Sequence, residues 1–409
     1  MLQKSFKKTT LALSLSTMAF SAVLQAADDQ LILWHSYRGA EKSSLEKVVQ
    51  QYNQDMAGKG VKIKSLAVPH DAYADKITAA VPRGKGPDVF IFSQDRLGGW
   101  IESGIIQSVD FFIEDETLEN VDEKLVSALT YQDTIYGIPL NFKSTALIYN
   151  KKLIKTPPKT DKELITLAKK HTNKAAGQFG LAYKYNKFYF HVPIMNAFGG
   201  RVFDEKSNPV LNSKENKASL SYMMDWYENG QFLPEEPSDA LITSLFNKSK
   251  AAMVISGPWF LGEVNDDIDV GIAPLPTITK TGKPMEPWLS VEGAYISTKS
   301  KYQEKAFNFI QYLTTKDVGL TMALEGGQLP ANRTVYEDIR VLKNPILKGF
   351  YDQMKTATPM PNRAEMTIVW SHTPTALNKI VKKTTTIDKA MDQAQQFALK
   401  DIQVLRKSQ

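Results

Sequence analysis

Two residue types that carry much of protein chemistry are absent or rare in this chain. The 409 residues include no cysteine and only five histidines. Without cysteine the chain forms no disulfide bonds, no thiolate metal site and no lipid anchor on an N-terminal cysteine. The histidines never fall at metal-ligand spacing, and no Gly-x-Ser-x-Gly motif is present. We therefore predict no metal, no cofactor and no catalytic residue.

Signatures of nucleotide and nucleic-acid binding are also lacking. The nearest thing to a glycine loop, residues 83–86 (RGKG), precedes an apolar run typical of a strand rather than a helix. That context is typical of a simple turn. The formal net charge of +6 is modest, and the basic residues form no clustered face. These features argue against a nucleic-acid partner.

The first 26 residues have the pattern of a secretory signal peptide. Three lysines within residues 4–8 precede an apolar stretch that runs from about residue 9 to residue 24. This stretch is too short and too rich in serine and threonine for a membrane span. The segment Leu24-Gln25-Ala26 offers a cleavage site, so we expect cleavage after Ala26 and a periplasmic location.

The chain that would remain after cleavage is long for one core. It has 383 residues, and its net charge falls to +3 because the removed segment carries three lysines and no acids. A length of this order favours two domains.

Short apolar runs and amphipathic segments alternate at the start of this chain. Strands are predicted over residues 31–34 and 61–68, and helices over 45–52 and 72–81. Residues 86–104, GPDVFIFSQDRLGGWIESG, then combine an apolar run, a polar turn and a helical spacing of apolar residues. This alternation predicts a parallel sheet covered by helices, with the polar turn at the carboxyl end of a strand.

The pattern changes at residues 135–150 (IYGIPLNFKSTALIYN), where Pro139 and Asn141 interrupt it. We place a crossing between two lobes there. Buried strands are predicted at 146–149 and 251–255, and residues 293–297 are predicted to return to the first lobe. A helix is predicted over 306–313, and the last helix, 387–405, follows threonines suited to cap it.

Aromatic residues stand beside polar ones at several predicted strand ends. Phe92 precedes Ser93-Gln94-Asp95-Arg96, residues 188–191 read FYFH, and Trp259 and Trp370 occupy similar positions. Flat rings stack on the C–H faces of sugars, and charged or amide groups hydrogen-bond the hydroxyls. The same rings are equally compatible with a buried core, because aromatic residues bury much apolar area.

The order and spacing of several motifs resemble the maltose/maltodextrin-binding proteins, within the larger family of extracellular solute-binding proteins of ATP-driven importers. The matching stretches cover nearly the whole chain after residue 26 and read GPDVFIFSQDRLGGWIESG, YGIPLNFKSTALIYNKKL followed by PPKT, LFNKSKAAMVISGPW, AFNFIQYLTTKD, MPNRAEMTIVW and TTTIDKAMDQAQ. The implied fold is α/β, a two-lobed periplasmic binding protein fold of type II with a ligand cleft between lobes joined by a hinge.

The resemblance also suggests how the chain divides. We assign residues 1–26 to the signal peptide, 27–141 plus 293–339 to the N-terminal lobe, and 142–292 plus 340–409 to the C-terminal lobe. Hinges are expected near Asn141–Ser144 and near Glu292.

Nine ligand-binding residues are implied by the resemblance: Arg38, Phe92, Asp95, Arg96, Lys143, Lys187, Tyr189, Trp259 and Trp370. Asp95 and Arg96 match the family's sugar-binding acid and arginine, and the last three match its stacking rings. Phe92 stands where maltose binders carry a tryptophan, and Arg38 falls near a family lysine. Lys143 and Lys187 replace glutamates, and Asp239 replaces a tyrosine.

The function implied is capture of an oligosaccharide, of the maltose or maltodextrin type, and its delivery to an ABC permease in the inner membrane. We expect a monomer without enzymatic activity. Two alternatives stay open at this point. The lysines at 143 and 187 suit an acidic oligosaccharide or another anionic solute, and a secreted glycoside hydrolase would share sugar-stacking residues.

Overall fold

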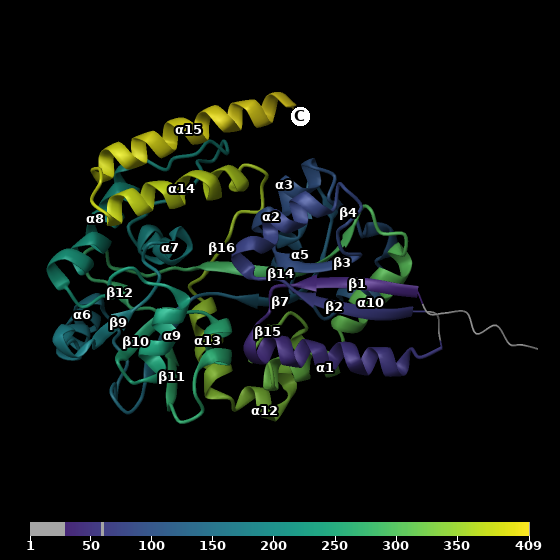
Figure 1. Cartoon of the computed structure of the whole chain (residues 1–409), viewed down its shortest axis with the longest axis horizontal. Coiled ribbons are helices and arrows are strands. Elements are labelled where there is room, and N and C mark those ends of the chain that lie inside the picture. The colour runs from purple at the N-terminus through teal and green to yellow at the C-terminus, as the bar shows by residue number, and fades with distance from the viewer. Residues whose placement is uncertain (1–28, 59–60, 409) are drawn as a thin grey trace, which may run out of the picture.

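The computed structural model describes residues 29–58 and 61–408, and the expected signal peptide lies outside them. These residues form two α/β lobes, each built on its own main sheet (Figure 1). The strands β7 and β14 lie in the middle of the view, between the halves that carry the two sheets. The two-lobed α/β fold is the one that the sequence predicts.

The larger sheet has eight strands in the order β15-β7-β14-β3-β1-β2, with β4 and β16 paired to β14 outside this order. Strands β1, β2 and β3 are parallel, whereas β14 runs antiparallel to β3 and β7. The parallel part confirms the strand–helix alternation predicted for the start of the chain. The strands are β1 (Asp29–His35), β2 (Val61–Ala67), β3 (Val89–Ser93), β4 (Ile106–Gln107), β7 (Ile138–Lys143), β14 (Trp288–Ser297), β15 (Leu329–Pro330) and β16 (Thr358–Pro359).

Both faces of this sheet are covered by helices. Strand β3 is therefore buried on both faces, which explains why its side chains are apolar from Val89 to Phe92. Successive side chains of a strand point to opposite faces. Val89 and Ile91 belong to the core under α1 (Gly39–Asp55) and α10 (Gln303–Leu313). Phe90 and Phe92 belong to the core of the other face, under α2 (His70–Ala80) and α3 (Leu97–Glu102).

The smaller sheet has four strands in the order β11-β8-β10-β9. Strand β8 is antiparallel to β10 and β11, and β9 is parallel to β10. The strands predicted at residues 146–149 and 251–255 are confirmed as β8 and β10. The strands are β8 (Ala146–Asn150), β9 (Phe179–Ala182), β10 (Ala251–Ser256) and β11 (Val270–Ala273).

The remaining elements surround these sheets. The other α-helices are α4 (Asp115–Leu118), α5 (Glu123–Ala128), α6 (Asp161–Lys170), α7 (Phe188–Ala197), α8 (Lys214–Asp225), α9 (Asp239–Asn247), α11 (Lys316–Leu324), α12 (Ile339–Leu342), α13 (Pro345–Met354), α14 (Met366–Val381) and α15 (Ile387–Ser408). Two small hairpins pair β5 (Thr130–Tyr131) with β6 (Thr134–Ile135) and β12 (Thr277–Ile278) with β13 (Lys283–Pro284). Two short 3-10 helices matter for the site, η1 (Gln94–Arg96) and η5 (Pro258–Glu263).

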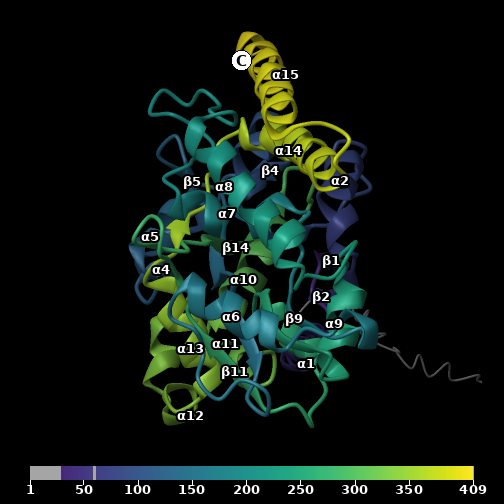
Figure 2. The same cartoon turned by 90° about the vertical axis from the view of Figure 1, so that its left-hand side faces the viewer.

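Helix α15 packs on α14 and projects at the top of the molecule (Figure 2). Thr386 caps its start, because its hydroxyl oxygen accepts a hydrogen bond from the backbone N–H of Lys389 at 3.3 Å. The threonine cap predicted for this helix is therefore confirmed.

The chain passes from the larger to the smaller sheet between β7 and β8, through Ser144 and Thr145. This is the crossing predicted within residues 135–150. Strands β7 and β14 pair from Ser290↔Lys143 to Ala294↔Ile138, with a register shift between Glu292 and Gly293. The division of the chain at residues 141/142, 292/293 and 339/340 stays a prediction.

Candidate functional site

Three of the predicted site residues meet at the junction of the two sheets. Tyr189 on α7, Trp259 on η5 and Lys143 at the end of β7 come from different elements. The rings of Tyr189 and Trp259 lie 6.4 Å apart between centroids, and the Lys143 ammonium lies 5.3 Å from the centre of the Trp259 ring. The Tyr189 hydroxyl is 3.1 Å from the Ser290 hydroxyl on β14. Both rings are half-buried, which leaves part of each available to a ligand.

Lys143 forms an ion pair with Glu292, and its ammonium donates a hydrogen bond to one carboxylate oxygen. The strand register explains this contact. Lys143 is opposite Ser290 and Asn141 is opposite Glu292, so all four side chains share one face and the ion pair is a diagonal neighbour. The side chains of Lys143 and Glu292 are only 16% and 4% exposed.

The pair is ionised although it is buried. Burial favours the neutral acid, but the attraction and hydrogen bond of Lys143 outweigh this effect and hold the pKa of Glu292 below its usual value. Burial likewise disfavours the ammonium, yet Glu292 and Glu41 together raise the pKa of Lys143. The second oxygen of Glu292, Oε2, is buried and has no hydrogen-bond partner within the described residues.

A polar network that the sequence analysis missed lies beside this pair. The Asn141 amide donates hydrogen bonds to the Tyr37 hydroxyl at 2.8 Å and to Gln328 Oε1 at 3.1 Å. Glu41 is buried in the first turn of α1, and burial raises its pKa to about 7. Burial also lowers the pKa of His35 to about 4. For three of these residues a signal was available, because His35 ends β1 and Tyr37 and Glu41 follow it closely, at the carboxyl edge of the parallel strands.

The predicted ring at Phe92 lies in the core and not at the junction surface. It is 5% exposed. His70 stacks on it at 5.5 Å between centroids with an 18° interplanar angle, while Tyr73 and Trp100 pack at 5.4 and 5.3 Å. The cause is the alternation within β3, which directs Phe92 to the face that α2 and α3 cover.

Asp95 and Arg96 occupy η1, directly after β3, as the sequence predicts. Gln94 anchors this turn to β14, because its amide oxygen accepts from the Val291 N–H at 2.7 Å and its NH₂ donates to the Leu289 carbonyl at 3.2 Å. Asp95 accepts a hydrogen bond from the Ser93 hydroxyl, and its other oxygen lies 3.4 Å from Arg96 Nε. Asp95 is 6% exposed, so the acid and its arginine neighbour form a mostly buried pair.

Trp370 joins a row of rings that includes a tryptophan the sequence analysis missed. Trp288 lies 5.7 Å from Trp370, 5.9 Å from Phe188 and 6.3 Å from Tyr189 between centroids. Trp288 is 4% exposed, whereas Trp370 is half-buried. The row connects the second predicted tryptophan to the Tyr189–Trp259 group through Trp288.

The remaining predicted residues, Arg38 and Lys187, form no ring contact among the described residues. Arg38 Nε is 3.1 Å from Glu263 Oε1, and Arg38 Nη1 is 3.9 Å from Asp239 Oδ2. Lys187 is exposed at the start of α7, and its ammonium has no acidic partner within the described residues.

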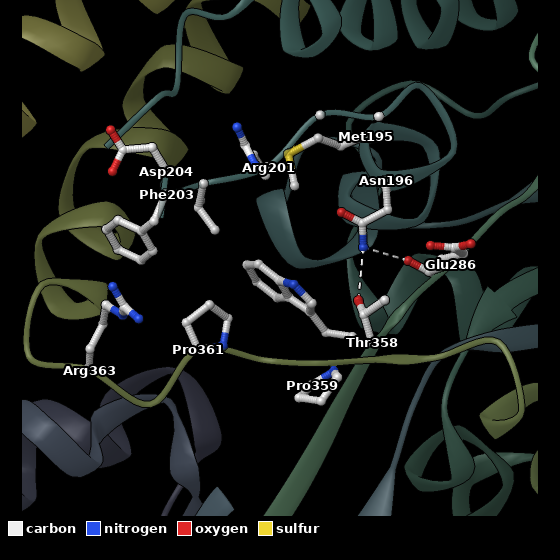
Figure 3. Close-up of a pocket in the computed structure, with 14 residues that line it drawn as sticks. Met195, Asn196, Arg201, Phe203, Asp204, Glu286, Thr358, Pro359, Pro361 and Arg363 are labelled. Atoms are coloured by element: carbon white, nitrogen blue, oxygen red, sulfur yellow. Dashed lines mark hydrogen bonds between the residues drawn. The ribbon is translucent and has the colours of Figure 1, made fainter. Parts of the chain in front are cut away.

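A pocket of about 460 Å³ adjoins the row of rings at Trp288, which lines it (Figure 3). Its walls come from the end of α7 and the following loop, from the segment before β14, and from residues 358–363. None of the nine predicted site residues lines it, although Trp288 does. In Figure 3, the Asn196 side chain spans one wall by donating to the Glu286 carbonyl at 2.8 Å and to the Thr358 hydroxyl at 3.1 Å.

The described residues offer no metal centre, since no three acidic or histidine side chains in ranges 29–58 and 61–408 are grouped closely enough to hold an ion. No helix in these ranges has the length and apolar character needed to cross a membrane. The groups that the structure places at the junction are aromatic rings, paired charges and hydrogen-bonding side chains.

Comparison with known proteins assigns the chain to a family. A maltotriose-binding protein of Pyrococcus abyssi is 29% identical over 387 residues, which cover 93% of this chain and 84% of the relative. A galactooligosaccharide-binding protein of Bacillus subtilis is 26% identical, with 92% of this chain and 90% of the relative covered. A maltose/maltodextrin-binding domain from Bdellovibrio bacteriovorus, solved with maltotriose, superposes with a TM-score of 0.86 at 27% identity and covers 92% of this chain and 100% of its own. Residues 38–319 match the model of the family described as bacterial extracellular solute-binding protein. The chain therefore belongs to that family.

Proposed function

We propose that the protein captures a neutral oligosaccharide of the maltodextrin type between its lobes and delivers it to an ABC importer. The observation that carries this proposal is the pair of half-buried rings, Tyr189 and Trp259, on elements that meet beside β14. Aromatic rings provide large apolar contact surfaces for sugar C–H groups. The relatives whose names state maltotriose or maltodextrin as ligands support this sugar class.

The charges at the junction favour a neutral ligand over an anionic one. Lys143 pairs with Glu292, Arg96 lies beside Asp95, and Arg38 lies beside Glu263. A cation that already faces a carboxylate gains little from a second anion, because its charge is balanced. Lys187 is the exception, and it is exposed. The anionic alternative therefore loses the feature that favoured it.

The hydrolase alternative is not favoured either, because the family consists of binding proteins and not enzymes. Binding proteins of this shape work by closure: ligand bridges two lobes and shifts the equilibrium toward the closed arrangement. We propose hinges at Asn141–Ser144 and at Glu292, where β7 and β14 lie between the two sheets. Two of the three proposed lobe boundaries, 141/142 and 292/293, fall at these hinges.

The same proposal includes location and assembly. An extracellular or periplasmic protein is what the family description implies. We propose the periplasm, with removal of residues 1–26, an inner-membrane permease as partner and a monomeric state. Mass measurement of the exported protein should give an N-terminus at Ala27, and light scattering should give the mass of one chain.

Calorimetric titration tests the ligand. Maltotriose, a galactotriose and a trigalacturonate should be compared on the same preparation, together with a thermal-shift measurement. We expect binding of maltotriose, a higher unfolding temperature in its presence, and no response to the uronate. No response to either neutral sugar would contradict the proposal.

Variants assign the binding to the rings. Trp259→Ala should weaken maltotriose binding at least tenfold, since aromatic anchors dominate binding energies. Phe111→Ala is the matched control, because Phe111 is 93% exposed and lies on the larger-sheet lobe away from the junction. Equal losses in the two variants would place the site elsewhere.

A further inference from the structure

One contact between the lobes lies outside the ring group and involves a residue that the resemblance assigns to the ligand. Arg38 immediately precedes α1, which packs on the larger sheet. Glu263 ends η5, which follows strand β10 of the smaller sheet. The Arg38 Nε–Glu263 Oε1 distance of 3.1 Å therefore joins the two lobes directly.

The acidic side of this contact is held in place by its own lobe. Glu263 Oε2 accepts a hydrogen bond from the Thr243 hydroxyl at 3.1 Å. Asp239, which lies 3.9 Å from Arg38, already accepts a hydrogen bond from the Lys184 ammonium at 2.7 Å. Lys184 compensates the charge of Asp239. Glu263 is therefore the carboxylate whose charge Arg38 compensates. A pre-positioned acid of this kind loses little side-chain entropy when the arginine arrives.

The backbone beside the ion pair is also fitted to close approach. Gly39 has φ of +51°, and a Cβ there would lie 2.5 Å from the Gly262 carbonyl oxygen. Both the conformation and the space therefore require glycine at this position. Gly262 is close to the same segment, since a Cβ built on it would lie 3.0 Å from the Ala40 nitrogen. Two glycines thus allow the start of α1 to rest on η5.

We propose that Arg38, Gly39, Gly262 and Glu263 form an interlobe contact that stabilises the closed arrangement, and that Arg38 sets affinity and complex lifetime without contacting the sugar. This inference deepens the proposed function and rests on it. The ion pair exists only while the lobes are together, and opening returns both groups to water. Because the side chains are 36% and 30% exposed, the pair is partly screened and its effect is modest.

The test uses Arg38→Gln, Glu263→Gln and the double variant, with dissociation constants and dissociation rates measured for maltotriose and a longer maltodextrin. Each single variant should raise both dissociation constants by the same factor, about two- to fivefold, mainly through faster dissociation. The double variant should add no further loss, because one contact is removed in all three. High salt should weaken the unsubstituted protein and leave the double variant unchanged.

A ligand-free readout separates this inference from the proposed function. The chain has no cysteine, so Gln50→Cys on α1 and Lys248→Cys after α9, both at exposed positions, allow specific labelling for a distance measurement. Arg38→Gln and Gly39→Ala should each shift the label distances toward the open arrangement, whatever sugar the protein binds.

Two results would overturn the inference. The first is a change in the ratio of affinities for the two sugars in Arg38→Gln, which would show that Arg38 contacts the ligand. The second is an unchanged distance distribution in both Arg38→Gln and Gly39→Ala. Failure of every sugar to bind, with the distance shift observed, would instead refute the proposed function and retain the interlobe contact.

Discussion

Replacing Lys143 with methionine tests the buried ion pair at the hinge strands. The change removes the cation that balances Glu292 and keeps a long side chain at the position. Glu292 is 4% exposed, and burial alone would raise its pKa. The carboxylate then either remains buried without a partner, at a cost of about 3–5 kcal/mol, or takes up a proton. From the ordinary value of 4.5, protonation at pH 7 costs about 3 kcal/mol. We expect a loss near 3 kcal/mol.

The prediction also fixes the direction in which the free energy of unfolding changes with pH. In the unsubstituted protein the pKa of Glu292 is lowered, so its contribution to stability is present above pH 4.5 and is lost as the pH falls through the folded-state value. In Lys143→Met the pKa of Glu292 is raised instead. The free energy of unfolding should then fall as the pH rises above 4.5, and the deficit should almost vanish in acid.

Urea denaturation at several pH values measures this loss. Lys143→Met/Glu292→Gln serves as the control, because it removes both charges and should recover most of the free energy of unfolding. A loss below about 1 kcal/mol in Lys143→Met at neutral pH, or a deficit that does not change with pH, would refute the reasoning. So would a double variant that is no more stable than the single one.

Three further predictions concern single residues. Burial raises the pKa of Glu41 to about 7, so the folded protein retains a proton there that the unfolded chain releases above about pH 4.5. The unfolding free energy should therefore fall, relative to Glu41→Gln, between those pH values, and urea titrations at both ends check this. Lys187 is exposed and unpaired within the described residues, so Lys187→Ala should change maltotriose affinity less than twofold in calorimetry; a tenfold loss would place it on the ligand. Tyr189→Phe keeps the ring and loses only the contact with Ser290, so its affinity should exceed that of Tyr189→Ala at least fivefold.

Much of the fold was predictable from local patterns. The runs at 31–34, 61–68 and 89–92 became β1, β2 and β3. The continuous apolar run of β3 fits a strand that is buried on both faces, whereas the alternating residues of β2 fit a strand with one face exposed. The length of β14 was not predictable, since its residues from Ser290 to Ala294 pair with β7, a partner about 150 residues earlier in the chain. Such pairing is specified by tertiary contacts and not by the local sequence.

The sequence indicated which rings lie near one another more clearly than which charges pair, and the ligand-binding role of these residues stays a prediction. Tyr189 on α7 and Trp259 on η5 lie 6.4 Å apart between ring centroids, so the structure brings together two of the rings that the resemblance implies. Phe92 differs for a reason that the sequence contains: two-residue periodicity places it with Phe90 under α2 and α3. The partner of Lys143 depended on the β7–β14 register, which no local pattern reveals.

The interlobe contact and the Lys143–Glu292 pair have different roles, although both are ion pairs. The first acts on lobe closure, and the second balances charge beside the rings. Arg38 and Glu263 are partly exposed and come from different lobes, so their attraction responds to closure and to salt. Lys143 and Glu292 are buried on neighbouring strands, so their charges are balanced within the β7–β14 pair. Neither pair leaves a net charge facing the rings. Ligand choice then depends on the shape and hydrogen bonding around Tyr189 and Trp259. The Arg38–Glu263 ion pair instead determines how long the lobes stay together. Affinities for neutral sugars should accordingly change in parallel with salt, while their order remains constant.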